Sequence, residues 1–118
     1  MSSMNAGKQL DSSDELHITV SGRKSGKRIS LPVWFVRENN TIFLLPLNGT
    51  DTQWYRNLER MKKITISSGN LKLEPSAKLV RDQKTIDLIV EKLRKKHSPA
   101  EVKKYYTKFD AGVELSLG

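Results

Sequence analysis

Runs rich in β-branched and aromatic residues recur along this chain between short turn signals, which is typical of β-strands. They predict strands at 16–21, 28–37, 41–47, 64–68, 71–80 and 113–117. Apolar residues at helical spacing predict helices at about 51–63, 83–97 and 99–108. Because hairpin strands dominate and most helices come late, we expect an α+β fold. Its form would be a six-stranded antiparallel closed or split β-barrel with peripheral helices.

The turn between the first two predicted strands has an unusual composition. It reads Gly22-Arg23-Lys24-Ser25-Gly26-Lys27-Arg28, with four cations, a hydroxyl, two glycines and no carboxylate. Backbone amides beside Lys and Arg can hold a phosphate or carboxylate, so one hypothesis is an anion site. The alternative is a hairpin tip that charge keeps soluble. The spacing excludes a nucleotide triphosphatase loop, which needs four residues between its glycines and a Ser or Thr directly after the Lys.

Two prolines lie within or near the ends of neighbouring predicted strands. Pro32 cannot donate to a strand ladder, so we expect it at a sheet edge or a bulge, often where a ligand comes close. Pro46 stands near the end of the next strand. The pair indicates either a place where strand pairing is interrupted or two ordinary edge positions.

The predicted helix at 51–63 follows Asn48-Gly49. Thr50 and Gln53 have the spacing of a capping box. Trp54, Leu58 and Met61 recur at i, i+4 and i+7 and are expected to share the buried face, with Tyr55 and Asn57 off that stripe. Residues 49–52 place free amides at a helix N-terminus, a second possible anion site.

The length of the chain predicts a single domain. The chain has 118 residues, and we expect a flexible N-terminal lead-in at 1–15 and a single domain at 16–118. No apolar run approaches a membrane span of roughly 18 residues, and the first residues lack a secretory signal pattern. The sequence contains no cysteine, which excludes disulfides and thiolate chemistry and favours a cytoplasmic location.

The formal net charge of +8 requires an explanation. Nucleic acid is one candidate partner and a polyanionic small molecule another, while a solvated basic surface is the third possibility. The cations divide between the hairpin turn and the C-terminal third, and aromatics do not alternate with them as a single-strand stacking surface requires. Charge alone leaves these possibilities open.

The chain offers little for acid–base, nucleophilic or metal chemistry. Its two histidines, His17 and His97, lie far apart in sequence, and no His or carboxylate pair has metal-ligand spacing. What remains is a basic turn, glycine-bearing loops, two prolines, and Trp34, Trp54 and Tyr55. This set suits a planar aromatic cofactor with a phosphate tail, which carries its own reactivity.

The segments GRKSGKRISLP, LPLNGTDTQWYRNL and SPAEVKKYY resemble the deazaflavin-dependent nitroreductase family, split-barrel relatives of the FMN-binding pyridoxamine phosphate oxidases. The resemblance covers about residues 16–117. Gly22, Lys24, Ser25, Gly26 and Pro32 match the family's turn pattern, with Arg28 one position early or after a gap. Trp54, Tyr55 and Asn57 match its helix motif.

The resemblance implies a set of site residues. The cofactor phosphate would be held by the turn, at Lys24, Ser25, Gly26 and Arg28. The ring would contact Pro32, Val33 and the loop of Leu45, Pro46, Leu47, Asn48 and Gly49, with Trp54, Tyr55 and Asn57 closing the pocket. Tyr105 and Tyr106 are loose counterparts of the family's late tyrosines. Where the family's loop often carries a Lys, this chain has none, so both coenzyme F-420 and FMN are expected candidates.

The resemblance therefore predicts an oxidoreductase that binds a deazaflavin or flavin and transfers hydride to a small acceptor such as a quinone or nitro compound. A basic nucleic-acid-binding barrel and a non-catalytic cofactor carrier are the alternatives. A homodimer is a further expectation, because split barrels often pair.

Overall fold

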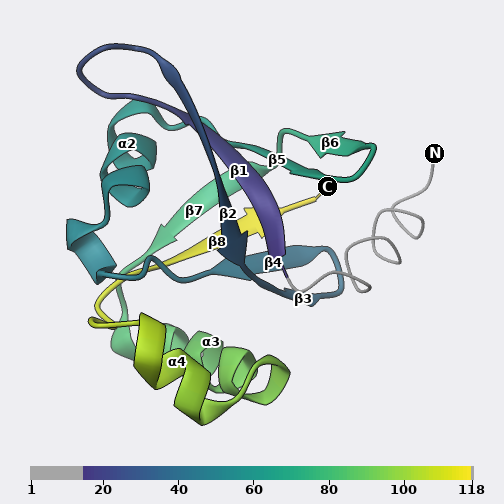
Figure 1. The fold of residues 1–118 in the computed structure, drawn as a ribbon, viewed down its shortest axis with the longest axis vertical. Helices are drawn as coiled ribbons and strands as arrows, with labels where there is room; N and C mark the ends of the chain where they lie inside the picture. Colours follow the sequence, from purple (N-terminus) through teal and green to yellow (C-terminus); the bar gives the residue numbers. More distant parts are fainter. Residues whose placement is uncertain (1–14, 118) are drawn as a thin grey trace.

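The computed structural model describes residues 15–117, and within this range it has eight strands in two antiparallel four-stranded sheets (Figure 1). The first sheet has the order β2-β1-β5-β6, with β1 Glu15–Ser21, β2 Arg28–Trp34, β5 Thr65–Ser68 and β6 Leu71–Leu73. The second has the order β3-β4-β8-β7, with β3 Val36–Glu38, β4 Thr41–Leu44, β7 Ser76–Val80 and β8 Gly112–Ser116. The helices are η1 Gly49–Asp51, α2 Gln53–Met61, α3 Gln83–Lys96 and α4 Pro99–Tyr105. The predicted α+β class is confirmed. The lead-in predicted at 1–15 lies outside the described residues, except for Glu15, the first residue of β1.

The structure has eight strands where the sequence predicts six, because two of the predicted strands are interrupted. The strand expected at 28–37 breaks at Phe35, which separates β2 in the first sheet from β3 in the second. The strand expected at 71–80 breaks at Glu74-Pro75, between β6 in the first sheet and β7 in the second. At both breaks the chain crosses from one sheet to the other. An apolar pattern that continues through such a crossing does not reveal it, although Pro75 is a signal because proline cannot donate to a ladder.

The main core lies between the two sheets. Leu16, Ile18 and Val20 of β1 are buried and alternate with polar residues, as an antiparallel strand with one solvated face requires. Ile18 is fully buried and pairs with Leu31 of β2 and Ile66 of β5. Truncation of such a side chain to Ala costs about 2–5 kcal/mol. This core makes β1 the rigid centre of the first sheet and leaves β2 as its outer strand.

The position of β2 in its sheet tests the prediction made for Pro32. Because β2 ends the strand order of its sheet, the prediction that Pro32 lies at a sheet edge is confirmed. Pro46 lies outside β4 and is buried, in the segment that leads to η1. Along β2, Ile29, Leu31 and Val33 share one face, and Ile29 remains 42% exposed. The outer strand therefore exposes Ile29, while Leu31 and Val33 are partly buried against the main core.

Helix α2 begins differently from the expectation. The predicted capping box is wrong, since the N-cap is Thr52 and the Thr50 backbone N–H and hydroxyl donate to Asp110 at 2.9 and 2.8 Å. Trp54 and Leu58 are buried as predicted, but Met61 is 39% exposed, because the helix ends there. Tyr55 and Asn57, expected off the buried stripe, are buried. Helix α2 thus has contacts on more than one side.

Helices α3 and α4 lie side by side beyond the ends of the sheets (Figure 1). Their caps follow the sequence, with Asp82 accepting from Thr85 N–H at 3.0 Å and Ser98 accepting from Glu101 N–H at 3.2 Å. The bond from Thr85 lowers the pKa of the Asp82 carboxyl. A second core joins them to the sheets through Val36, Leu45, Val80, Ile86, Ile89, Val90, Leu93, Val102 and Tyr106. Within residues 15–117 no helix has the length and apolarity needed to cross a membrane.

Candidate functional site

A cavity of about 650 Å³ opens between the outer strand β2, helices α2 and α4, and the segment between β4 and η1. Its lining comprises Glu15, Ile29, Leu31, Pro32, Val33, Trp34, Leu45, Leu47, Asn48, Asp51, Thr52, Gln53, Trp54, Asn57, Glu101, Tyr105 and Tyr106. The lining is largely apolar and aromatic, with a few polar groups, which is the usual make-up of a small-molecule site. A hollow of about 750 Å³ between α3 and α4 is lined mainly by charged side chains and suits such a ligand less well.

An aromatic cluster forms one end of this cavity. Trp34 stacks on His97 with ring centroids 3.8 Å apart and planes 9° apart. Tyr105 meets the edge of Trp34 at 5.5 Å, and Tyr106 packs on Phe109 at 6.2 Å. Burial raises the pKa of Tyr106, so its hydroxyl stays protonated at neutral pH. The wall of the cavity at Trp34 is therefore fixed from behind by α3 and α4.

The segment before α2 is fixed by Asp110. Thr50 donates to this carboxylate twice, and Lys108 lies 3.4 Å from it. Desolvation raises the pKa of Asp110, but the bonds from Thr50 and the charge of Lys108 outweigh it and lower the pKa on balance. Gly49 has φ +55°, and a Cβ there would stand 1.9 Å from Asp110 Oδ1. Only glycine fits this approach, which sets the path of the loop beside the cavity.

Arg23 joins the hairpin turn to α2. Its backbone N–H and its Nη1 both donate to Asn57 Oδ1, at 3.1 and 2.7 Å, and its Nη2 donates to Gln53 Oε1 at 2.9 Å. Gln53 and Asn57 line the cavity, whereas Arg23 does not. The turn is thus attached to the cavity through two carboxamides.

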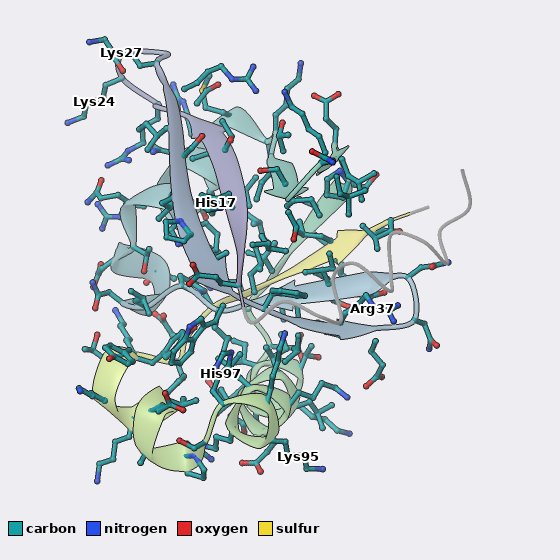
Figure 2. The ribbon with its side chains drawn as sticks, turned by 45° about the vertical axis from the view of Figure 1, so that its right-hand side comes forward. His17, Lys24, Lys27, Arg37, Lys95 and His97 are labelled. Carbon is teal, nitrogen blue, oxygen red and sulfur yellow. The ribbon has the colours of Figure 1, made fainter. Side chains whose placement is uncertain are left out.

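The charged side chains of the cavity lining are acidic, whereas those of the hairpin turn are basic. The lining contains three carboxylates, Glu15, Asp51 and Glu101, and no Lys or Arg. Asp51 is paired with Arg56 at 3.1 Å and with Lys108 at 3.2 Å. Lys24 and Lys27 project outward from the tip of the hairpin, at the opposite end of the molecule from Lys95 (Figure 2). The positive charge near this cavity therefore lies outside the lining, at the turn and beside Asp51 at Arg56 and Lys108.

The structure brings together part of the expected site. Of the expected contacts, the lining includes Pro32, Val33, Leu45, Leu47, Asn48, Trp54, Asn57, Tyr105 and Tyr106. It does not include Lys24, Ser25, Gly26, Arg28, Pro46, Gly49 or Tyr55. The turn residues are exposed, and Arg28 instead borders a recess of about 60 Å³ elsewhere on the first sheet. Tyr55 is fully buried in the main core, where burial raises its pKa.

Some lining residues were not expected from the sequence. Ile29 and Leu31 could have been found, since they alternate with Ser30 on the strand that carries Pro32. Glu15 and Glu101 come from distant segments, and no local pattern links them to the cavity. Gln53 was expected as part of a helix cap, and Arg23 as one of several equivalent cations.

Comparison of the sequence with protein families matches residues 8–112 to the family described as "Uncharacterized protein conserved in bacteria (DUF2255)". The chain belongs to this family. The match includes every residue that lines the cavity, from Glu15 to Tyr106, and ends at the first residue of β8. A comparison with curated proteins finds no match.

Solved structures resemble the fold of this DUF2255 chain at low sequence identity. An F420-H2 dependent reductase (FDR-A) is 19% identical with a TM-score of 0.67, covering 87% of this chain and 94% of that one. The heme storage protein HutZ from Vibrio cholerae is 13% identical with a TM-score of 0.71, covering 96% and 87%. An FAD-binding protein from Mesorhizobium loti is 9% identical with a TM-score of 0.68, covering 100% and 91%. These similarities support the split-barrel fold.

Proposed function

We propose that this protein is an oxidoreductase that holds a flavin or deazaflavin in the cavity beside β2 and passes hydride to a small acceptor such as a quinone or nitro compound. The carrying observation is the cavity itself, about 650 Å³ with both tryptophans of the chain in its lining. The similarity to a reductase and to an FAD-binding protein supports this choice of ligand, although it extends only to the fold.

The residues present fit a flat ring. Val33, Leu47 and Trp54 offer apolar surface, and Asn48 and Asn57 offer hydrogen bonds that orient a polar ring edge. Such a cofactor supplies the hydride chemistry when it is bound. The protein's own part is to hold the ring, expose one side of it to the acceptor and limit water at the apolar wall.

The contacts of the phosphate tail remain a proposal. Lys24, Ser25, Gly26 and Arg28 lie beyond the cavity lining, so we propose that they meet only the tail of a cofactor whose ring lies beside Trp54. Both coenzyme F-420 and FMN have a phosphate, and both remain candidates. Asp51 is paired with Arg56 and Lys108, but Glu15 and Glu101 of the lining disfavour an anionic tail inside the cavity, which supports a tail at its hairpin side.

A homodimer is also part of the proposal. Ile29, Leu47 and Tyr105 all border the cavity and are 42%, 45% and 48% exposed. Large apolar side chains gathered around an open cavity are typical of a surface that a second chain covers. Sedimentation of the purified protein tests this part independently of the chemistry.

The test of the proposed activity is turnover with a reduced cofactor. Purified protein is mixed anaerobically with reduced coenzyme F-420 or reduced FMN, and cofactor oxidation is followed after addition of menadione or a nitrofuran. We expect faster oxidation than in the cofactor alone, and a smaller increase in Val33→Trp, whose larger side chain takes up part of the cavity beside β2. Cofactor binding without turnover would make the protein a carrier and refute the oxidoreductase proposal.

A further inference from the structure

We infer that Arg23 is a positioning residue: it turns the carboxamides of Gln53 and Asn57 so that both present NH₂ groups to the cavity, where they donate to the acceptor-bearing edge of a heterocyclic ring. The inference rests on the proposed function for the identity of the ligand. It adds two residues, Arg23 and Gln53, to the expected site and gives Asn57 a specific role.

The orientation of the two amides follows from the chemistry of arginine. A guanidinium and a backbone N–H can only donate hydrogen bonds. Asn57 receives one bond from each of these groups, and Gln53 receives one from the guanidinium. The oxygen of each amide must therefore face Arg23, because the flipped amide would place NH₂ against a donor. The NH₂ group of each amide points away from Arg23.

The NH₂ groups have a free side toward the cavity. Within residues 15–117, neither Asn57 Nδ2 nor Gln53 Nε2 makes a hydrogen bond. Asn57 is only 4% exposed, yet its Nδ2 is not among the described side-chain atoms that are both sealed from solvent and unpaired. Because Asn57 lines the cavity, we infer that the cavity is the space its NH₂ group reaches. A nearly buried donor that faces a cavity is satisfied best by a ligand acceptor.

Arg23 has no acidic partner that would explain its position otherwise. Within the described part of the chain it forms no ion pair with a carboxylate, and its side chain donates to the two amides. It also pins the turn to α2, which is a structural role. A purely structural role needs only the amide oxygens, so replacing the NH₂ groups separates the two functions.

The depth of Asn57 indicates which part of the ligand it meets. Trp54 and Asn57 lie one helical turn apart on α2, so their side chains are neighbours on the helix surface, and both are 4% exposed. The carbonyls and ring nitrogens of a heterocycle are neutral acceptors that can enter such an apolar recess. A phosphate keeps more of its hydration and suits the exposed turn. We therefore assign the amide pair to the ring edge.

The test uses Asn57→Asp, Gln53→Glu and Arg23→Lys, with Lys27→Ala as the control in the same turn. Asp and Glu keep the oxygen that Arg23 binds and replace NH₂ with a second acceptor. We expect Asn57→Asp to keep or raise the melting temperature and to weaken riboflavin and FMN equally, by roughly 10- to 100-fold. Gln53→Glu and Arg23→Lys should weaken both ligands less, and Lys27→Ala neither.

Each outcome is decisive. Failure of the unmutated protein to bind riboflavin, FMN or coenzyme F-420 refutes the proposed function. Normal binding with unchanged affinity in Asn57→Asp and Gln53→Glu refutes only the amide inference. Weakening of FMN without riboflavin assigns the amides to the phosphate and overturns the ring-edge assignment. Should Asn57→Asp fail to fold, the exposed Gln53→Glu gives the same comparison.

Discussion

The imidazole of His97 lies parallel to the indole of Trp34, with ring centroids 3.8 Å apart and planes 9° apart. This contact joins the C-terminal end of α3 to the last residue of β2. Because Trp34 also lines the cavity, the stack links the position of α3 to the cavity wall. The second core therefore contributes to the site as well as to stability.

We expect His97→Ala to lower the free energy of unfolding by about 1 kcal/mol, since stacked aromatic pairs contribute about 0.5–1.5 kcal/mol. Tryptophan emission should change as well, because Trp34 loses its neighbour. His17→Ala is the matched control, as His17 is exposed on β1 and pairs across the sheet with Pro32. Chemical denaturation followed by fluorescence measures both effects. Equal stability of the two variants would contradict the role of the stack.

Gly49→Ala should destabilise the protein more than Gly26→Ala. Both glycines have positive φ, +55° and +74°, so both substitutions carry backbone strain. Only at Gly49 does the new Cβ also collide with Asp110, whereas Gly26 has open space. We expect about 1 kcal/mol for Gly26→Ala and at least 1 kcal/mol more for Gly49→Ala. Thermal unfolding of the two variants measures the difference, and equal losses would show that the loop yields freely.

The lowered pKa of Asp110 predicts that part of the protein's stability is lost in acid. Its pKa is lower in the folded than in the unfolded chain, so its contribution is complete above the unfolded value of 3.8. The contribution is lost as the pH falls through the folded pKa. Asp110→Asn should lower stability at pH 7 by about 1 kcal/mol, because a partly exposed charge-assisted bond is lost. The difference from the unmutated protein should vanish toward pH 2. Denaturant titrations at a series of pH values test this, and a constant difference would contradict it.

Tyr106 is the better placed of the two candidate tyrosines for proton donation. Its side chain is 5% exposed in the cavity lining, where burial raises its pKa, which keeps the hydroxyl protonated but makes it a weaker acid. If it donates a proton to the acceptor, Tyr106→Phe should lower turnover roughly 10- to 100-fold with unchanged cofactor affinity. Tyr105→Phe should have a smaller effect, because Tyr105 is 48% exposed. Equal turnover in all three proteins would exclude both hydroxyls.

The sequence predicts most of the fold because each strand and helix has its own local pattern. The hairpin of β1 and β2, the cap at Asp82 and the start of α4 at Ser98-Pro99 follow from residues that are close in sequence. The crossing at Phe35 could not be placed, because apolar residues continue through it, whereas Glu74-Pro75 offered a signal that the prediction of one strand at 71–80 overlooked. Thr50 was misassigned since its partner, Asp110, is 60 residues away.

The site was predicted less completely for the same reason. Sequence indicates that the turn is basic, but it cannot distinguish Arg23, which reaches α2, from Lys24, which points outward. Only the tertiary packing of the hairpin on α2 decides which cation meets Gln53 and Asn57. The structure therefore adds a second role for the turn beside the proposed contact with an anionic tail, in which one arginine orients two amides.

Tryptophan fluorescence gives the most direct test of a ring-binding cavity. The chain has two tryptophans, Trp34 and Trp54, and both line the cavity. Titration with FMN and coenzyme F-420 should quench the emission in a saturable manner with one ligand per chain, and each single Trp→Phe variant should retain part of the quenching. A linear decrease equal to that of free tryptophan, for both ligands, would contradict the account.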